Sequence, residues 1–247
     1  MKKQKILALS VGRSDYDRYY PVIKKLNEIK SVNFYLYLTK AHFDPIFGKT
    51  FKFIDRKFKI LNNNFSSVAK SDFVSSFSKD LNYLNTQIKK IKPHKIIVLG
   101  DRFEMLMGPI VAMPYNIPVI HFYGGAVTLG AIDELVRHAI TKMSHYHFTL
   151  LPQYKRRVSQ LGEEKWRIKT VGMHELKLLK SISTINKIKL SKLLKFNFKK
   201  PYILLTFHPV TLDLNNIEAQ MEQLIKAVKQ SKLNAVITYP NFDPKYK

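Results

Sequence analysis

Short apolar runs alternate with amphipathic stretches along most of the chain. The apolar residues in these runs are continuous, which is typical of strands buried on both faces of a parallel sheet. We predict such strands at Ile6–Val11, Val32–Leu38, Ile96–Leu99, Ile117–Ile120, His147–Leu150 and Ile168–Val171. Between them the apolar residues follow helical spacing, and this alternation of strands and helices predicts an α/β fold with a parallel sheet.

The helices that this spacing predicts lie at Tyr16–Ile29, Ser71–Ile91, Phe103–Tyr115, Ile132–Met143 and Pro152–Leu161. We expect Pro109 and Pro114 to bend or shorten the third helix, because proline cannot donate the backbone hydrogen bond that a helix requires. The aromatic-rich region Phe43–Phe65 has no clear period, and we assign no element to it.

We divide the chain into a Rossmann-like first domain, residues 1–175, a lysine-rich linker, residues 176–200, and the beginning of a second domain, residues 201–247. The last part contains one strand–helix–strand unit, at Tyr202–Phe207, Asn216–Lys229 and Ala235–Thr238. Such a unit leaves sheet edges and faces uncovered. We therefore expect either that the chain is truncated or that another surface covers this unit.

Basic residues outnumber acidic residues by 42 to 18, which gives a formal net charge of +24. A charge of this size is compatible with nucleic acid, a membrane surface or an anionic small ligand. However, 34 of the basic residues are lysines, and they are spread along the chain rather than gathered with aromatic residues on one face. We therefore favour a solvated, lysine-biased surface over nucleic-acid binding.

The chain has no cysteine, which excludes disulfides, zinc–thiolate sites and cysteine nucleophiles. No apolar run reaches the length of about 18 residues that a bilayer span requires, so we expect no membrane partner. The basic and then apolar start lacks a small-residue cleavage site and ends in a glycine turn, which favours a first strand over a signal peptide. We expect a cytoplasmic protein.

Polar and glycine residues follow the predicted strands that end at Leu99 and Ile120. Ligands of parallel sheets bind just beyond the carboxyl ends of the strands, so we expect these residues to form one crevice. The crevice would contain Asp101, Arg102, His121, Gly124, Gly125, Asp133, Glu134, Arg137 and His138. Asp101 and Arg102 could instead form an ion pair that fixes the end of their strand, and Arg137 could pack beneath the crevice.

Four segments occur in order across nearly the whole chain: GDRFEML, HFYGGAVTLGAIDELVRHAITKMSH, TFHPVT and TYPNFDP. Together they resemble the hydrolysing UDP-N-acetylglucosamine 2-epimerases of sialic, legionaminic and related nonulosonic acid pathways. The resemblance implies two Rossmann-like domains in the glycosyltransferase-B arrangement, with the UDP-sugar bound between them. Only the first domain and the opening of the second are expected here. No cofactor is implied, and the spacing of the histidines predicts no metal site.

The reaction that the resemblance implies removes the proton at C2 of the sugar while UDP leaves from C1, and water then adds across the glycal to give the 2-epimer. Asp101 matches a catalytic aspartate, and Asp133 is our candidate for a second acid or base. His208 matches a histidine that contacts the UDP-sugar and is important for catalysis. The candidates for substrate binding are Arg13, Arg102, His121, Gly124, Gly125, Arg137, Thr211 and Asn241.

The turn at Gly12–Asp15 suits the pyrophosphate of such a substrate. Arg13 supplies a fixed cation, and we expect free backbone N–H groups at the start of the following helix to bind the anion as well. Ser14 and Asp15 can equally well act as caps of that helix. Glu134 is interpreted as a residue of a first helical turn, where the helix dipole favours a negative charge.

The chain departs from the family pattern at several positions. Tyr123 stands where relatives carry Glu or His, and Ala126 stands where they carry Glu. A phenol is a poor base near neutral pH, since its unperturbed pKa is about 10. Gly172–Leu176 differs from the GxPGLD segment of relatives, and their glycine- and serine-rich phosphate loop and ribose-binding acidic residue have no counterpart.

Three hypotheses follow from these observations. The chain is the N-terminal part of a longer or split epimerase, or a degenerate relative without catalysis, or, as the less favoured option, a basic nucleic-acid-binding protein. The substrate is UDP-N-acetylglucosamine, with UDP-N,N'-diacetylbacillosamine as the alternative. We expect low or absent activity from the chain alone, and association either with copies of itself or with a second polypeptide that supplies the missing half-domain.

Overall fold

The computed structural model describes residues 3–45, 48–62, 73–179, 183–210 and 215–238. The chain forms two compact units. The first unit comprises residues 1–129 and 133–178, and the second comprises residues 130–132 and 179–247. Each unit is described by itself below.

The first unit is built on a seven-stranded sheet with the order β3-β2-β1-β4-β5-β6-β7, in which every neighbouring pair is parallel. Its strands are β1 (Gln4–Ser10), β2 (Val32–Leu38), β3 (Lys59–Asn62), β4 (Lys95–Leu99), β5 (Val119–Phe122), β6 (Tyr146–Thr149) and β7 (Ile168–Thr170). This order confirms the predicted α/β fold with a parallel sheet. It also places β1 beside β4, so the chain leaves these two strands toward opposite edges of the sheet.

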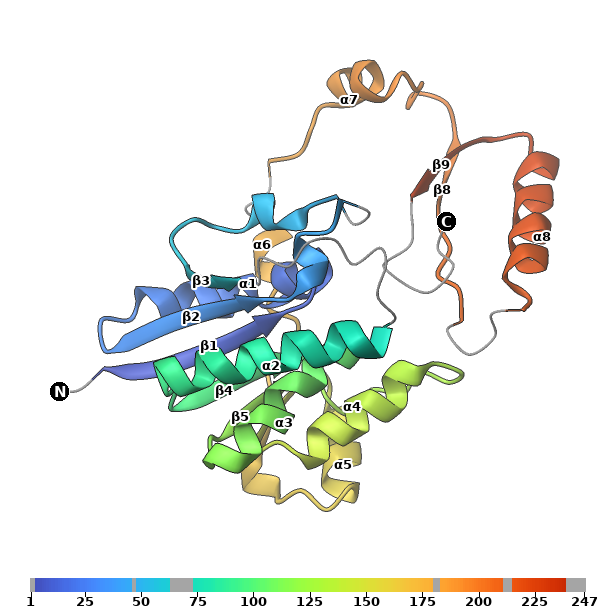
Figure 1. Ribbon diagram of the computed structural model, residues 1–247. Helices are drawn as coiled ribbons and strands as arrows, with labels where there is room; N and C mark the ends of the chain where they lie inside the picture. The colour runs from blue at the N-terminus through green and yellow to red at the C-terminus, as the bar shows by residue number, and fades with distance from the viewer. Residues whose placement is uncertain (1–2, 46–47, 63–72, 180–182, 211–214, 239–247) are drawn as a thin grey trace. The chain divides into compact units, whose positions relative to one another are not determined.

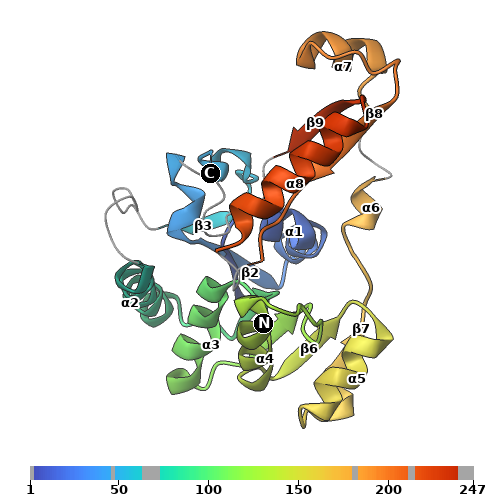
Figure 2. The ribbon, with the colours of Figure 1, turned by 90° about the vertical axis from the view of Figure 1, so that its right-hand side faces the viewer.

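Helices cover both faces of this sheet (Figures 1 and 2). Helix α1 lies on one face, and α2, α3 and α4 lie on the other. The helices of the first unit are α1 (Arg13–Glu28), α2 (Phe73–Ile91), α3 (Met107–Ala112), α4 (Ile132–Lys142) and α5 (Pro152–Gln160), and α6 (Leu176–Leu179) follows at its boundary. The predicted start of the second helix at Ser71 lies outside the described residues.

The core of the first unit consists of the central strands and the helix faces against them. Three consecutive residues of β1, at positions 7–9, have no exposed surface, and those at positions 96–98 of β4 are at most 3% exposed. Because side chains on both faces of these strands are buried, the strands carry continuous apolar runs, as the sequence predicts. The sheet therefore provides a rigid base for the residues that follow its carboxyl edge.

The segment between β4 and β5 differs from its predicted form. In place of one helix at Phe103–Tyr115, the chain forms a 3-10 turn, the short helix α3 and a second 3-10 turn. Pro109 lies within α3 and Pro114 within the second turn, so the predicted shortening by proline is confirmed. Strand β5 begins at Val119, two residues later than predicted, because Asn116 adopts a left-handed conformation and Pro118 follows it.

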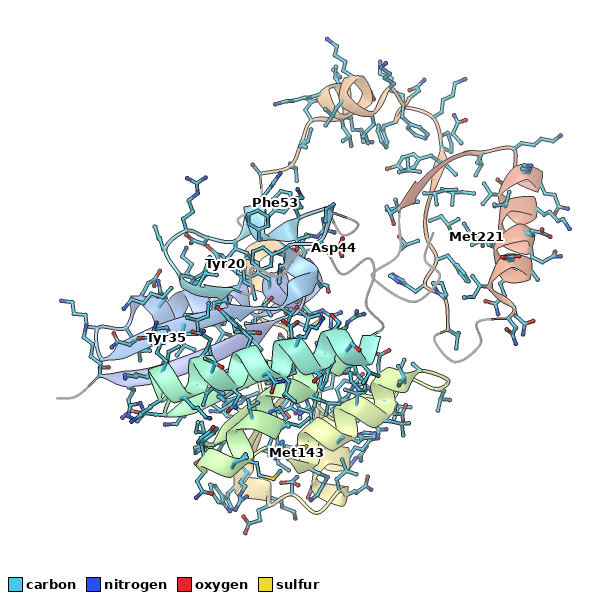
Figure 3. The ribbon with its side chains drawn as sticks, in the orientation of Figure 1. Tyr20, Tyr35, Asp44, Phe53, Met143 and Met221 are labelled. Atoms are coloured by element: carbon cyan, nitrogen blue, oxygen red, sulfur yellow. The ribbon has the colours of Figure 1, made fainter. Side chains whose placement is uncertain are left out.

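The region that the sequence left unassigned contains strand β3 and two short 3-10 turns. Phe58, just before β3, packs edge-on against the rings of Tyr16, Tyr20 and Phe34. Figure 3 labels Tyr20, Tyr35 and Phe53 in this aromatic part of the first unit. The element depends on aromatic contacts between distant segments, which explains why it has no local period.

The second unit contains α7 (Lys187–Leu194), β8 (Tyr202–Thr206), α8 (Ile217–Gln230) and β9 (Asn234–Thr238). Strands β8 and β9 pair in parallel, which confirms the predicted strand–helix–strand unit. Met221, labelled in Figure 3, lies on α8. Helix α7 lies within the stretch predicted as a linker. It begins at Asn186, whose side chain accepts a hydrogen bond from the Ile188 N–H at 2.8 Å, so a cap rather than an apolar period marks it.

Candidate functional site

The candidate site lies where the carboxyl ends of β1 and β4 meet. Gly12 and Arg13 follow β1, and Asp101 and Arg102 follow β4. Because the chain leaves these neighbouring strands in opposite directions, their ends form a topological switch point, and open α/β sheets bind ligands at such a point. The first unit thus brings Arg13, Asp101 and Arg102 to one edge of the sheet.

The turn after β1 is stabilised by Asp15. Helix α1 begins after Gly12, and the Asp15 carboxylate accepts hydrogen bonds from the backbone N–H groups of Val11 at 3.0 Å and Gly12 at 3.2 Å. Asp15, in the first turn of α1, therefore caps the N-terminus of this helix. The Ser14 hydroxyl donates to the Asp15 carboxylate at 3.5 Å. The Asp15 carboxylate therefore occupies the two N–H groups that precede the helix, and the expected anion contact concerns the N–H groups of the helix's own first turn.

Burial raises the pKa of Asp15 to about 6. The positive charge of Arg102 and the two backbone hydrogen bonds act in the opposite direction, and the negative charge of Glu104 adds to the increase. The side chains of Arg102 and Glu104 lie 3.9 Å apart and are both partly exposed. These effects show that the end of β4 and the first turn of α1 lie within electrostatic reach of each other. Arg13 is exposed beside them.

The carboxylate of Asp101 is held by Arg137 of α4 rather than by its neighbour Arg102. Arg137 donates from Nε to Asp101 Oδ2 at 2.9 Å, and its Nη2 also donates to this oxygen. The Arg137 side chain is 3% exposed and that of Asp101 is 31% exposed. The expected alternative, an ion pair of Asp101 with Arg102, is therefore wrong. A buried guanidinium orients a carboxylate that still reaches solvent.

Arg137 also orders the loop before α4. It donates to the carbonyl of Ala126 at 2.8 Å and to the Thr128 hydroxyl at 2.9 Å. The backbone N–H of Thr128 donates in turn to Glu134 at 2.6 Å, so Glu134 lies in the first turn of α4 as predicted. Asp133 precedes it in the same turn and is partly exposed. Arg137 therefore packs beneath the crevice, one of the two positions expected for it.

His121 lies within β5 instead of beyond its end. Its side chain has no exposed surface, its Nε2 lies 2.8 Å from the Gly100 carbonyl, and its Nδ1 lies 3.2 Å from the Thr141 hydroxyl. Burial lowers the pKa of His121 to about 4, so the imidazole is neutral near pH 7 and its Nε2 donates to Gly100. In this state the side chain supports the end of β4 and does not contact solvent, which corrects its expected place in the open crevice.

Gly124 and Gly125 are required by close packing. A Cβ atom at Gly124 would lie 2.9 Å from His121 Nδ1, and one at Gly125 would lie 2.5 Å from the Tyr154 carbonyl oxygen. Gly125 also has a φ of 84°, which favours glycine. Arg157 donates to the Gly125 carbonyl. The two glycines let the chain after β5 pass closely over α4 and α5.

The sequence did not identify the contact between Tyr123 and Glu175. The Tyr123 hydroxyl donates to Glu175 Oε2 at 2.9 Å across 52 positions of sequence. In the sequence, Tyr123 is only a departure from the family pattern, and Glu175 is only part of an atypical segment. No local pattern pairs residues so far apart, so the fold was needed to find this contact.

The remaining candidates lie in the second unit. His208 follows β8 and is exposed. Thr211 and Asn241 lie outside the described residues. Two cavities lie away from all the residues named as candidates. One of about 540 Å³ is lined by α7 and the segment after it, and one of about 550 Å³ lies beside the ends of α3 and α4, next to Met143 (Figure 3).

The described residues also limit the other types of site. In this part of the chain, no three His, Cys, Asp or Glu side chains gather in a way that could hold a metal ion. Among the described helices, none is both long and apolar enough to cross a membrane.

Comparisons with known proteins agree with the architecture. Residues 24–247 match the family described as UDP-N-acetylglucosamine 2-epimerase. The chain is 34% identical over 247 residues to the GDP/UDP-N,N'-diacetylbacillosamine 2-epimerase (hydrolyzing) of Campylobacter jejuni, covering 98% of this chain and 64% of the relative. It is 32% identical over 230 residues to the polysialic acid biosynthesis protein P7 of Escherichia coli, covering 91% of this chain and 58% of that relative.

A similar fold is found in the UDP-N-acetylglucosamine 2-epimerase of Neisseria meningitidis, solved with UDP-N-acetylglucosamine bound. The TM-score is 0.76 at 20% identity, with 98% of this chain and 67% of the other covered. At this identity the likeness shows the fold alone, which is the glycosyltransferase-B-like arrangement expected from the sequence. The chain thus spans less than two thirds of the length of the two curated relatives and about two thirds of this structure.

Proposed function

Since the chain belongs to the UDP-N-acetylglucosamine 2-epimerase family, we propose that it acts in the hydrolysing 2-epimerisation of a UDP-activated 2-acetamido sugar. The observation that supports this most directly is the Asp101 carboxylate at the β1–β4 junction, oriented by Arg137 and partly open to solvent. The product, a free 2-epimer such as N-acetylmannosamine, would enter the synthesis of sialic-type acids, in line with the name of the Escherichia coli relative.

The proposed reaction has two steps. In the first, a base removes the proton at C2 while the bond between C1 and the UDP oxygen breaks, which leaves a glycal and UDP. In the second, water adds its hydroxyl group to C1, and an acid returns a proton to the opposite face of C2. The steps require one acid or base on each face of the sugar and cations for the departing diphosphate.

We assign these roles to residues at the carboxyl edge of the sheet. Asp101 serves as one acid or base, because Arg137 fixes its carboxylate while part of it stays exposed. Asp133, partly exposed in the first turn of α4, is the candidate for the other. Arg13 and Arg102 supply positive charge for the diphosphate. His208 is assigned a role at the UDP-sugar from its motif, and Thr211 and Asn241 are weaker candidates for substrate binding.

The buried candidates contribute differently. Arg137 and His121 act by orienting Asp101 and the end of β4, since their side chains are 3% exposed and fully buried respectively. Gly124 and Gly125 keep the loop after β5 close to α4 and α5. In this proposal these residues shape the sugar site, and Asp101 and Asp133 transfer the protons.

UDP-N-acetylglucosamine is the first substrate to test, and UDP-N,N'-diacetylbacillosamine is the second. The name of the Campylobacter jejuni relative, at 34% identity, favours the second sugar. The two sugars differ in the groups at C4 and C6 and share the acetamido group at C2, so both suit the same chemistry at C1 and C2. A comparison of the two turnover rates decides between them.

The test is to incubate the protein with each UDP-sugar in D₂O and to identify the products. The chain is assayed alone and together with a polypeptide corresponding to the rest of the relatives' length. We expect free UDP and a 2-epimer that carries deuterium at C2, with little or no turnover by the chain alone. Absence of both products in both arms, with folded protein, would refute the proposal. A chain that alone turns over about once per second or faster would show that it needs no second polypeptide.

A further inference from the structure

A buried histidine links the loop after β2 to the turn after β1. His42 has no exposed surface, and both of its ring nitrogens have a partner. Its Nε2 lies 2.9 Å from the hydroxyl of Ser10, the last residue of β1, and its Nδ1 lies 2.9 Å from the hydroxyl of Thr50. Both hydroxyl residues are buried as well. No role in the proposed function involves this histidine.

The hydrogen bonds of His42 have one consistent direction. Burial lowers the pKa of His42 to about 4, so the imidazole is neutral near pH 7, and one ring nitrogen donates while the other accepts. The Ser10 hydroxyl donates to the Gly12 carbonyl at 3.4 Å, so its oxygen accepts the proton of His42 Nε2. His42 Nδ1 then accepts from the Thr50 hydroxyl. A chain of three hydrogen bonds therefore runs from Thr50 to the backbone of Gly12.

Gly12 is the point at which this chain of hydrogen bonds reaches the candidate site. Its backbone is extended and caps α1, and Arg13 is the first residue of that helix. The Gly12 carbonyl also accepts the first hydrogen bond of the helix, from the Tyr16 N–H at 3.1 Å. Thr39, in the loop after β2, donates from its hydroxyl to the Val11 carbonyl at 3.2 Å. This loop therefore fixes the backbone of the two residues that precede Arg13.

Stability alone does not require a polar group at this place. Burying an imidazole and two hydroxyl groups is tolerated only when each of them finds a hydrogen-bond partner, whereas an apolar side chain carries no such condition. A fully paired polar network fixes one arrangement of the segments that it joins. The arrangement fixed here is that of the turn before Arg13, whose exposed side chain depends on this backbone for its direction.

We propose that His42 is a positioning residue, which acts through Ser10 to hold the turn that carries Arg13. In this conformation, Arg13 and the first N–H groups of α1 are directed at the diphosphate of the substrate. The inference rests on the proposed function and deepens it. His42 touches neither the sugar nor the diphosphate, and it transfers no proton. Its loss therefore weakens the binding of the diphosphate, and this effect depends on Arg13.

The test is a mutant cycle on the affinity for UDP. The dissociation constant of UDP is measured by calorimetry with the full chain, together with the polypeptide that completes the relatives' length. We expect His42→Leu to weaken UDP binding about tenfold, because the turn loses its support and Arg13 contributes less to the bound state. In the Arg13→Gln background, the same substitution should change the constant by less than about twofold, because the side chain that His42 positions is absent.

Ser10→Ala is the second variant, since it breaks the same chain of hydrogen bonds and removes little volume from the core. It should weaken UDP binding by a similar factor, and it decides the test in both backgrounds if His42→Leu does not fold. Ser144→Ala is the matched control, because it removes another buried serine hydroxyl of the first unit, which donates to the Ile140 carbonyl at 2.7 Å. It should leave the constant unchanged. Partial unfolding would lower the number of binding sites rather than their affinity, so calorimetry separates the two effects.

Equal weakening of UDP binding in both backgrounds would show a general structural effect and would overturn the inference. Wild-type affinity in both His42→Leu and Ser10→Ala would also overturn it, and in either case the proposed function would stand. If Arg13→Gln alone binds UDP like the wild type, the role of Arg13 at the diphosphate and the inference fail, while the role of Asp101 stands. If the wild type does not bind UDP, the proposed function fails, and the inference fails with it.

Discussion

Replacing Asp15 by asparagine should change how the stability of the first unit depends on pH. The Asp15 carboxyl group is buried, and burial raises its pKa from 3.8 to about 6. The folded state therefore binds this proton more tightly than the unfolded state. The stability that this proton provides is complete below pH 3.8 and is lost as the pH rises through 6. This shift of the Asp15 pKa corresponds to about 3 kcal/mol in the free energy of unfolding.

The amide of the Asp15→Asn variant remains neutral at every pH, and its oxygen can still accept the hydrogen bonds from Val11 and Gly12. The free energy of unfolding of this variant, relative to that of the wild type, should increase progressively between about pH 4 and pH 6. Above pH 6 the increase should stay constant at about 3 kcal/mol. Urea unfolding followed by the fluorescence of Trp166, the single tryptophan, reports on the first unit. Glu28→Gln, which removes an exposed carboxylate at the other end of α1, is the control for the loss of a negative charge. A difference that is constant from about pH 4 to pH 7, or that grows on acidification, would refute the reasoning.

Three further predictions concern buried residues of the same unit. Burial lowers the pKa of His42 from 6.5 to about 4, so the imidazole resists protonation in the folded protein and the wild type loses stability as the pH falls from 6.5 to 4. In urea titrations, His42→Gln should make this loss smaller by about 3 kcal/mol. Gly125→Ala should lower the melting temperature far more than Gly100→Ala, because both have positive φ but only Gly125 would place a Cβ against backbone atoms. Arg137→Met should lower the free energy of unfolding by about 3 kcal/mol, and Arg137→Lys should recover only part of it, because lysine cannot reproduce the paired guanidinium contacts. Equal losses for the two Arg137 variants would contradict the paired geometry.

The sequence predicts the elements whose signal is local. Continuous apolar runs such as Ile96–Leu99 located the central strands, because strands buried on both faces need no polar positions. The strand–helix–strand unit near the end of the chain was found in the same way. Strand β3 was missed because Phe58 packs on rings from α1 and β2, and helix α7 was missed because its cap at Asn186 marks it better than its apolar spacing.

The candidate site shows the same limit. The position of Asp101 after β4 could be predicted, since the end of an apolar run marks the edge of a parallel sheet. The partner of its carboxylate could not be predicted, because Arg137 lies 36 positions away in the sequence. Only the packing of α4 brings Arg137, rather than the adjacent Arg102, to this carboxylate. The two-residue shift of β5 moved His121 from the expected crevice into the sheet. Tyr123 and Glu175 were joined only by the fold.

The role assigned to Asp101 is tested most directly by deuterium at C2 of the sugar. Wild-type protein and Asp101→Asn are incubated with UDP-N-acetylglucosamine in D₂O, with the polypeptide that completes the relatives' length, and Trp166 fluorescence verifies that both are folded. We predict that the wild type incorporates one deuteron at C2 for each UDP that it releases. The variant should release UDP at a rate at least about 100-fold lower. An unchanged rate in the variant, or UDP release with the original C2 proton retained, would contradict the account.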